Sequence, residues 1–356
     1  MTGIPPIKSN ALVSYLGNSI TAQKNSFRSI LQQFLVQKYG VQVKEINAGI
    51  GGVGSLACAF LMDDFVLQRK PSVCFLDCCA ADRGGVTPEK YIDRSIEGII
   101  WNLINNDITV FILNLYRSDT DDIFSNRVVS IYKRIASKYN LQFIDIDAEF
   151  RLRILRGEIT VEDVVYDGIH THEKGARWTA ELIINELKFE QNSWQKQRKA
   201  YFQRAFVHTQ LILPNINWCN IGSSFIWGRF RLALKYAKLD VNQKILLPKQ
   251  EGVLVGLLVI ADENSGVVAI ERDQEIEYVQ VYDRWCDKER IQLIILDEIE
   301  LERESVSFFL TDKANGNRGA NGKLDTEIKI GKNLKVIAGL VQHKNNHYQK
   351  FKLFLR

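Results

Sequence analysis

The sequence lacks the features that mark several broad classes of protein. No apolar run reaches the roughly 18 residues that suggest a membrane-spanning helix, and Met1–Lys8 has neither the charged region nor the apolar region of a secretion signal. The formal net charge is only +4 over 356 residues, which gives no strong indication of nucleic-acid binding. We therefore expect no membrane partner, no nucleic-acid partner and a cytoplasmic location.

Metal-ligand and disulfide patterns are missing as well. His208, His343 and His347 are scattered along the chain without ligands at metal-binding spacing. The neighbouring Cys78 and Cys79 lie in an apolar run and are typical of reduced core residues. The six cysteines stand at positions 58, 74, 78, 79, 219 and 286. We expect no metal site.

What is present is the composition of a globular protein, with 46% hydrophobic and 25% charged residues. At roughly 100–200 residues per domain, the length predicts two domains. A polar, basic stretch divides two regions with different patterns. We expect an α/β domain over residues 1–190, a linker over 191–205 and a β-rich domain over 206–356.

In the first region, strand-like apolar runs alternate with amphipathic helical segments. This alternation predicts a parallel sheet with helices on both faces, a three-layer α/β/α sandwich. Strands are expected at 11–16, 41–46, 72–78, 109–115 and 141–146, and helices at 26–39, 56–67, 91–105, 123–139 and 174–187.

The second region has many short apolar runs separated by turn residues. Residues 252–260 and 267–270 flank Asp262–Gly266, which is a hairpin signal. The pattern predicts an antiparallel β-sandwich that resembles a jelly roll, and sandwiches of this type often serve as carbohydrate-binding modules. Further strands are expected at 277–282, 291–295, 305–310, 327–330, 334–341 and 349–355.

A Gly-x-Ser turn directly follows the first expected strand. Gly17-Asn-Ser-Ile-Thr21 leads from that strand towards the first helix. Such a tight turn at the carboxyl end of a parallel sheet exposes a serine hydroxyl where α/β proteins form their sites. Ser19 is therefore a candidate nucleophile.

A second motif precedes the last helix of the same region. In Tyr166-Asp-Gly-Ile-His170, the Asp and His lie three residues apart on a turn, so Asp167 can hydrogen-bond to the imidazole of His170 and orient it. His172 is nearby but has the wrong spacing from Asp167 for the same arrangement.

These two motifs, with the glycine-rich block Asn47-Ala-Gly-Ile-Gly-Gly52 between them, resemble in order and position those of the SGNH (GDSL-type) hydrolase family over residues 10–188. The resemblance implies that Ser19 is the nucleophile, His170 the general base and Asp167 its orienting partner. It also implies an oxyanion hole that includes the backbone N–H groups of Ser19 and Gly52.

The chain departs from the family pattern at two positions. Asn18 stands where the family's first block usually has Asp, and alignment of 71–82 with the third block puts Ala81 at the place of an oxyanion-binding Asn. Asp82 is retained, and we expect Asn18 and Asp82 to contact the substrate. A missing oxyanion donor costs roughly 10²–10³ in rate.

The glycine-rich block also permits a different interpretation. Gly49–Gly54 satisfies the G-x-G-x-x-G pattern of a dinucleotide-binding loop, and Asp77 falls about where a ribose-binding acid is expected. This loop normally follows the first strand of its fold, whereas here a strand and a helix precede it.

The family resemblance implies an enzyme that needs neither a metal nor an organic cofactor. We expect a serine esterase that removes O-acyl groups, most naturally O-acetyl groups, from a carbohydrate or polysaccharide through an acyl-Ser19 intermediate. The same residues would serve an O-acetyltransferase in cytoplasmic polysaccharide biosynthesis. Ala81 and the β-rich half also leave open a catalytically silent carbohydrate-binding protein.

Overall fold

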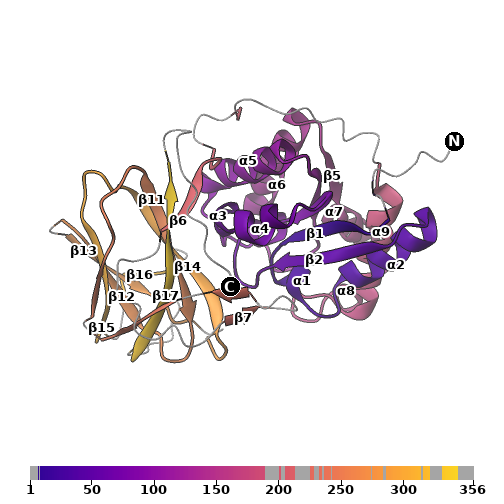
Figure 1. The fold of residues 1–356 in the computed structure, drawn as a ribbon. Coiled ribbons are helices and arrows are strands. Elements are labelled where there is room, and N and C mark those ends of the chain that lie inside the picture. Colours follow the sequence, from indigo (N-terminus) through magenta and orange to yellow (C-terminus); the bar gives the residue numbers. More distant parts are fainter. Residues whose placement is uncertain are drawn as a thin grey trace. The chain divides into compact units, whose positions relative to one another are not determined.

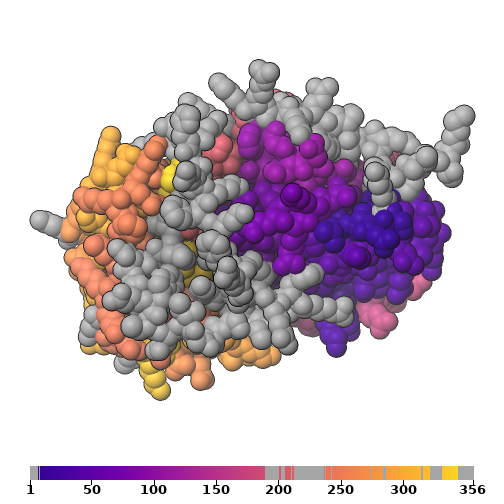
Figure 2. All heavy atoms as spheres, in the orientation of Figure 1, coloured from indigo at the N-terminus to yellow at the C-terminus, as the bar shows by residue number. Residues whose placement is uncertain are grey.

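In a computed structural model the chain forms two units, residues 1–207 and 208–356. The described residues are those coloured by sequence in Figures 1 and 2. They are residues 7, 9–188, 200–201, 205–212, 225–227, 232–234, 236–241, 243–273, 275–283, 286–313, 316–320 and 331–343.

The first unit is built on a five-stranded parallel sheet (Figure 1). Its three inner strands are mostly apolar, as expected where helices cover both faces, whereas the two edge strands carry several polar residues. The order is β2-β1-β3-β4-β5, so the chain starts near one edge, adds β2 outside β1, and then proceeds across the sheet. The strands are β1 (Ala11–Gly17), β2 (Val43–Gly49), β3 (Val73–Asp77), β4 (Thr109–Asn114) and β5 (Gln142–Asp145).

This strand order determines which helices share a face. Because crossover connections are right-handed, the helix after β1 lies on one face and the helices after β2, β3 and β4 lie on the other. Accordingly α2 (Phe27–Tyr39) packs on α9 (Glu173–Glu186), while α5 (Glu89–Asn105) packs on both α3 (Ser55–Phe65) and α6 (Asp122–Lys138) (Figure 1). The predicted α/β/α sandwich is confirmed.

Several short helices were not expected. Four of them are three to five residues long, which is too short for a periodic apolar pattern, and the fifth is a ten-residue helix after the last strand of the sheet that was not predicted from the sequence. These are α1 (Ser19–Ala22), the 3₁₀ helix η1 (Leu67–Arg69), α4 (Cys79–Arg83), α7 (Ile146–Leu155) and α8 (Val161–Val164).

Aromatic rings from neighbouring strands stack across one face of the sheet. The Tyr15 ring lies 5.2 Å from that of Phe75, which lies 5.4 Å from that of Phe111. All three side chains are fully buried, in one core with Leu31 and Ile183 from the covering helices. Residues at corresponding positions of β1, β3 and β4 thus fix the strands whose carboxyl ends form the candidate site.

The first unit also includes residues beyond its last helix. The Phe206 ring is fully buried and contacts the rings of Phe60 and Tyr91, at centroid distances of 5.4 and 6.0 Å. Residues 205 and 206 therefore pack on the α/β unit, and most of the expected 191–205 linker lies outside the described residues.

The second unit contains two larger, mostly antiparallel sheets, which confirms its predicted class. Their orders are β10-β15-β12-β13-β16 and β14-β11-β17-β6, with β9 also paired to β17. Buried residues of both sheets, among them Leu257 and Phe308, form one core. The strands are β6 (Thr209–Ile212), β7 (Phe225–Trp227), β8 (Leu232–Leu234), β9 (Ala237–Asp240), β10 (Lys244–Leu246), β11 (Val253–Ala261), β12 (Val267–Arg272), β13 (Glu275–Gln280), β14 (Arg290–Glu300), β15 (Val306–Thr311), β16 (Arg318–Gly319) and β17 (Asn333–Gln342).

The predicted hairpin around Asp262–Gly266 is wrong. β11 pairs with β14 and β17, whereas β12 pairs with β13 and β15, so the turn carries the chain from one sheet to the other. Both strands are almost wholly buried, and a turn signal does not distinguish a hairpin from a connection between sheets. The expected strands at 327–330 and 349–355 lie outside the described residues.

Candidate active site

Ser19 lies on a tight turn at the carboxyl end of β1. Asn18 caps α1, since its Oδ1 accepts the N–H of Ile20 at 2.9 Å, and its amide donates to the carbonyl of Asp77 at 3.2 Å. The first bond closes the turn, and the second ties it to β3, the neighbouring strand. Asn18 is buried, whereas Ser19 is half-buried, so the turn presents the serine side chain and holds the asparagine inside.

The structure brings Ser19, His170 and Asp167 together although Ser19 is 151 positions away from His170. The Nε2 atom of His170 lies 2.8 Å from Ser19 Oγ, and its Nδ1 atom lies 2.6 Å from Asp167 Oδ2. The imidazole thus bridges the hydroxyl and the carboxylate. Because Asp167 accepts the proton on Nδ1, Nε2 is left as the acceptor facing Ser19.

Asp167 also shapes the loop that carries His170. Its Oδ1 accepts the backbone N–H groups of Ile169 and His170, at 3.0 and 2.7 Å. Partial burial alone would raise the pKa of Asp167, but the hydrogen bond from the His170 ring and those two backbone N–H groups outweigh it and lower the pKa. The carboxylate is therefore held in the charged form that stabilises an imidazolium.

The glycine-rich block lies beside the serine. A Cβ placed on Gly51 would lie 3.8 Å from that of Ser19, an ordinary contact distance. The next residue, Gly52, has a left-handed φ of +76° and is exposed. Glycine is favoured at such a backbone position.

The two expected substrate contacts do not fit the structure. Asn18 is 4% exposed and its side chain serves the turn. Asp82 is fully buried, and its carboxylate accepts hydrogen bonds from the backbone of Ser55 and the hydroxyl of Tyr132. Burial raises the pKa of Asp82, with these partners opposing the shift. Both residues therefore support the framework of the site instead of facing a substrate.

Asp77 does not suit the dinucleotide-binding interpretation. Its side chain is 1% exposed, and Oδ2 accepts the hydroxyl of Thr21 at 2.8 Å, while Oδ1 is buried without a partner among the described residues. Burial raises the pKa of Asp77 well above its usual range. A ribose-binding acid has to reach its ligand, which this carboxyl does not.

Two more side chains flank the imidazole. The Tyr166 ring lies roughly parallel to that of His170, with 5.8 Å between centroids, and is 59% exposed. His172 precedes α9 at its N-cap and meets the edge of Tyr166 at 5.4 Å. The hydrogen bond to Ser19 is made by His170.

Sequence reasoning missed a group of buried charges behind the site. Asp147 lies in α7 and pairs with the fully buried Arg83 at 2.9 Å. Arg117, after β4, is 8% exposed and also contacts Asp147 through its backbone. Arg83, Arg117 and Asp147 all follow shortly after the ends of strands of the parallel sheet, and this placement in the sequence could have indicated that they lie near the site.

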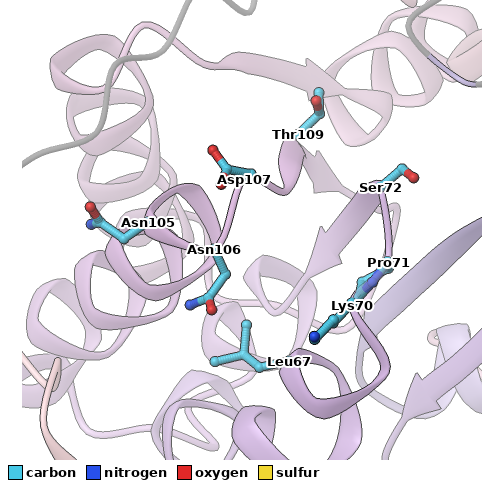
Figure 3. Close-up of a pocket in the computed structure, with 8 residues that line it drawn as sticks. All are labelled: Leu67, Lys70, Pro71, Ser72, Asn105, Asn106, Asp107 and Thr109. Carbon is cyan, nitrogen blue, oxygen red and sulfur yellow. The ribbon is translucent and has the colours of Figure 1, made fainter.

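A pocket of about 510 Å³ lies away from these groups, at the amino ends of β3 and β4 (Figure 3). Its lining is mainly polar and includes none of the residues around Ser19. The lining residues are Leu67, Lys70, Pro71, Ser72, Asn105, Asn106, Asp107 and Thr109. Since the carboxyl ends of the strands hold Ser19, this pocket is at the opposite end of the sheet.

The described part of the chain contains neither a candidate metal cluster nor a helix suited to a membrane. No cluster of three or more His, Cys, Asp or Glu side chains in it could hold a metal ion. None of its helices combines the length and apolarity needed to cross a membrane. Its five cysteines are buried and free; Cys219 lies outside the described residues.

No family model matches the chain. Over 68 residues, or 19% of the chain, it is 37% identical to an acetylxylan esterase of Xylanibacter ruminicola, and this match spans 13% of that enzyme's length. A two-domain esterase active on acetylated mannans, crystallised with mannopentaose, has a similar structure: the TM-score is 0.69 at 14% identity, over 96% of this chain and 93% of the other. Another structure of a two-domain esterase active on acetylated mannans gives 0.67 at 14% identity, over 95% and 93%.

These likenesses establish the fold. Both units of the chain have counterparts in one two-domain protein, an α/β unit and a β-rich unit. The resemblance drawn from the three motifs is thereby confirmed at the level of the fold.

Proposed function

We propose that the chain is a serine esterase that removes O-acetyl groups from a polysaccharide. The observation that carries this proposal is the continuous hydrogen-bonded path from Asp167 through His170 to Ser19, with heavy-atom distances of 2.6 and 2.8 Å. A serine hydroxyl, an imidazole and a carboxylate in this order are the groups that acyl transfer requires.

The chemistry follows from this arrangement. Ser19 Oγ attacks the acetyl carbonyl carbon while Nε2 of His170 takes the hydroxyl proton. Collapse of the tetrahedral intermediate breaks the ester bond, and the imidazolium returns the proton to the departing sugar oxygen. Water then attacks the acetyl-serine with His170 as base, which releases acetate and restores the hydroxyl. Asp167 stabilises the imidazolium in both halves of the cycle.

The oxyanion is assigned to backbone donors. The N–H groups of Ile20, Ala22 and Gln23 are occupied within the turn and α1, so we assign the N–H of Ser19 to the developing charge, with that of Gly52 from the adjacent block. Ala81 supplies no side-chain donor. The oxyanion hole therefore has one hydrogen-bond donor fewer than that of the family which the motifs resemble. We expect a lower kcat than that of a site with all three donors.

Two observations support a carbohydrate as the alcohol part of the ester. Tyr166 presents an exposed ring beside His170, close to where the departing oxygen must lie. Flat aromatic surfaces suit the apolar faces of sugar rings. In addition, the protein that shares both units of the fold is active on acetylated mannans.

The direct test is acetate release by the full-length chain from acetylated mannan and acetylated xylan, with fluorophosphonate labelling of the serine in parallel. Ser19→Ala and His170→Ala should each lower acetate release by at least roughly 10³-fold, whereas the matched control His172→Ala should stay within about threefold, because His172 makes no bond to Ser19. Release and labelling that survive in Ser19→Ala, or a wild-type chain that does neither, would contradict the proposal.

The role of Tyr166 is tested separately. Tyr166→Ala should raise KM for acetylated polysaccharide several-fold while leaving turnover of 4-nitrophenyl acetate nearly unchanged, because the small ester has no sugar ring to bind. Tyr166→Phe, which keeps the ring, should behave like the wild type. An equal loss on both substrates would show that the ring serves His170 and not the sugar.

A further inference from the structure

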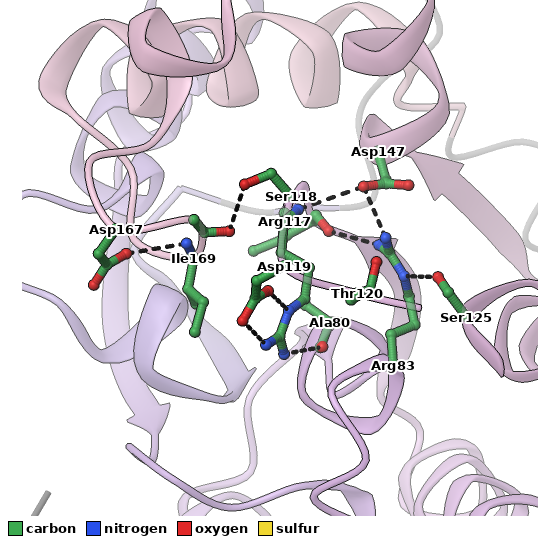
Figure 4. Close-up of polar contacts among 12 residues, drawn as sticks. Ala80, Arg83, Arg117, Ser118, Asp119, Thr120, Ser125, Asp147, Asp167 and Ile169 are labelled. Carbon is green, nitrogen blue, oxygen red and sulfur yellow. Dashed lines mark hydrogen bonds and ion pairs between the residues drawn. The ribbon is translucent and has the colours of Figure 1, made fainter. Parts of the chain in front are cut away.

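The tip of the loop that carries Asp167 and His170 rests on the segment after β4. The backbone N–H of Ser118 donates to the carbonyl of Gly168 at 2.8 Å, and the hydroxyl of Ser118 approaches the same oxygen at 3.4 Å (Figure 4). Gly168, between the two functional residues, has a left-handed φ of +84°. The position of Ser118 therefore determines where the tip lies.

Arg117 holds this segment in place. Its Nε and Nη2 atoms donate to the two carboxylate oxygens of Asp119, at 2.7 and 2.8 Å, and its Nη1 donates to the carbonyl of Ala80 at 2.7 Å (Figure 4). The guanidinium lies against Gly84, where a Cβ would come within 2.2 Å of Nη1. One side chain thus joins α4, which contains Ala81, to the segment under Gly168.

Charged side chains, of which Arg83 and Asp147 are buried, fix the other end of the segment. Arg83 pairs with Asp147 Oδ1 at 2.9 Å and donates to the carbonyl of Leu115 at 3.2 Å. Arg151 donates to Asp147 Oδ2 at 2.8 Å and to the carbonyl of Arg117 at 3.1 Å. Charged side chains are seldom buried without a structural or functional reason.

We propose that Arg117 is a positioning residue for the reaction. Through Ser118 and Gly168 it determines the position of the loop that carries Asp167 and His170, and thereby the distance between the His170 imidazole and the Ser19 hydroxyl. The proposal rests on the esterase function proposed above. Arg117 itself touches neither Ser19 nor the imidazole. It acts by keeping α4 and the tip of the loop at a fixed separation.

The expected effect is on chemistry more than on binding. A shift of about 1 Å between nucleophile and base costs on the order of 10²-fold in rate, whereas ground-state binding of the ester does not depend on that distance. Loosening Arg117 should therefore lower kcat and leave KM nearly unchanged.

The first test is Arg117→Met in the full-length chain, which keeps the length of the side chain and removes the guanidinium. We expect kcat for 4-nitrophenyl acetate to fall at least tenfold, with KM within twofold and an unchanged circular dichroism spectrum. The matched control is Arg127→Met: Arg127 also pairs with both oxygens of one carboxylate, that of Glu89, at 3.1 Å each, but lies outside this network. It should leave kcat unchanged.

A second readout does not depend on activity. The proton between His170 Nδ1 and Asp167 Oδ2 gives a downfield ¹H NMR signal when the loop holds that short bond, so Arg117→Met should broaden or abolish it, and Arg127→Met should not. A wild type that shows the signal but hydrolyses no ester would refute the esterase proposal alone. A folded Arg117→Met protein with wild-type kcat and an unchanged signal would overturn the positioning role.

Gly84→Ala is a second variant that tests the same contact and can be used if Arg117→Met does not fold. The new Cβ displaces the guanidinium without deleting any polar group, so kcat and the signal should fall in the same direction. If both variants fold, their effects should be less than additive, because they break the same contact. A folded Gly84→Ala protein with wild-type kcat and signal would likewise overturn the proposal.

Discussion

Asp167→Asn should abolish the proposed ester hydrolysis without unfolding the loop. Oδ1 of Asp167 accepts two backbone N–H groups, so the amide oxygen of an asparagine has to take this place. Its NH₂ group then faces Nδ1 of His170, where the carboxylate oxygen Oδ2 accepted a proton at 2.6 Å. The imidazole is forced into the other tautomer, with its proton on Nε2.

The magnitude follows from what that tautomer prevents. A protonated Nε2, 2.8 Å from Ser19 Oγ, donates to the hydroxyl and cannot take its proton. Reversing the tautomer in a serine–histidine–aspartate site costs roughly 10³- to 10⁴-fold in kcat, or about 4 to 5.5 kcal/mol in activation free energy. KM should change little, because Asp167 does not contact the ester.

The assay is steady-state hydrolysis of 4-nitrophenyl acetate, followed by fluorophosphonate labelling. Asp163→Asn is the matched control, since Asp163 closes the capping box of α8 and pairs with Lys174 but does not touch His170. It should retain kcat. A folded Asp167→Asn protein with kcat within tenfold of the wild type would refute the tautomer argument.

The pKa of Asp167 adds a pH dependence with a defined sign. The folded-state pKa lies below its usual value, so the carboxylate stabilises the fold above about pH 4, and this contribution disappears as the pH falls through the lowered pKa. The difference in unfolding free energy between the wild type and Asp167→Asn should therefore shrink in acid. Denaturant titrations at pH 7 and pH 3 measure this; a difference that grows in acid would contradict the sign.

Three further predictions concern the framework of the site. Folding raises the pKa of Asp77, so the wild type loses stability as the pH rises above about 4. The stability of Asp77→Asn relative to the wild type should therefore be greater at pH 7 than at pH 4, which thermal denaturation at the two pH values would show. Ala81→Asn should raise kcat for a small acetyl ester by up to roughly tenfold; a folded variant with unchanged kcat would show that position 81 is not a vacated donor position. A fragment of residues 1–207 should fold alone and be more stable than one of residues 1–190, by on the order of 3–5 kcal/mol, because the shorter fragment lacks the fully buried Phe206; equal stability in urea would argue against this.

The sequence was sufficient for the regular elements of the first unit. All five strands and five long helices lie within a few residues of their expected positions, because buried parallel strands are continuous apolar runs and the longer helices have periodic ones. The three motifs were also sufficient to select Ser19, Asp167 and His170, which the fold brings into hydrogen-bonding distance.

The burial of individual polar side chains and the pairing of strands in the second unit could not be predicted from local sequence patterns. Asp82 and Asp147 are hydrophilic in the sequence, but their partners Tyr132 and Arg83 come from other elements, so only the fold shows that they are buried. Likewise, Asp262–Gly266 has the composition of a hairpin turn whether its flanking strands pair or separate. Long-range partners decide both questions.

The bonds of Asp167 have an evolutionary consequence. Its carboxylate fixes the backbone of its loop as well as the imidazole, whereas the hydroxyl of Ser19 bonds only to His170 among the described residues. Descendants that lost the need for turnover would therefore shed the serine at little cost to the fold, yet selection for folding would still retain the aspartate. Among such descendants, an intact Asp-x-x-His motif would show only common ancestry, whereas the residue at position 19 would show whether hydrolysis had been retained.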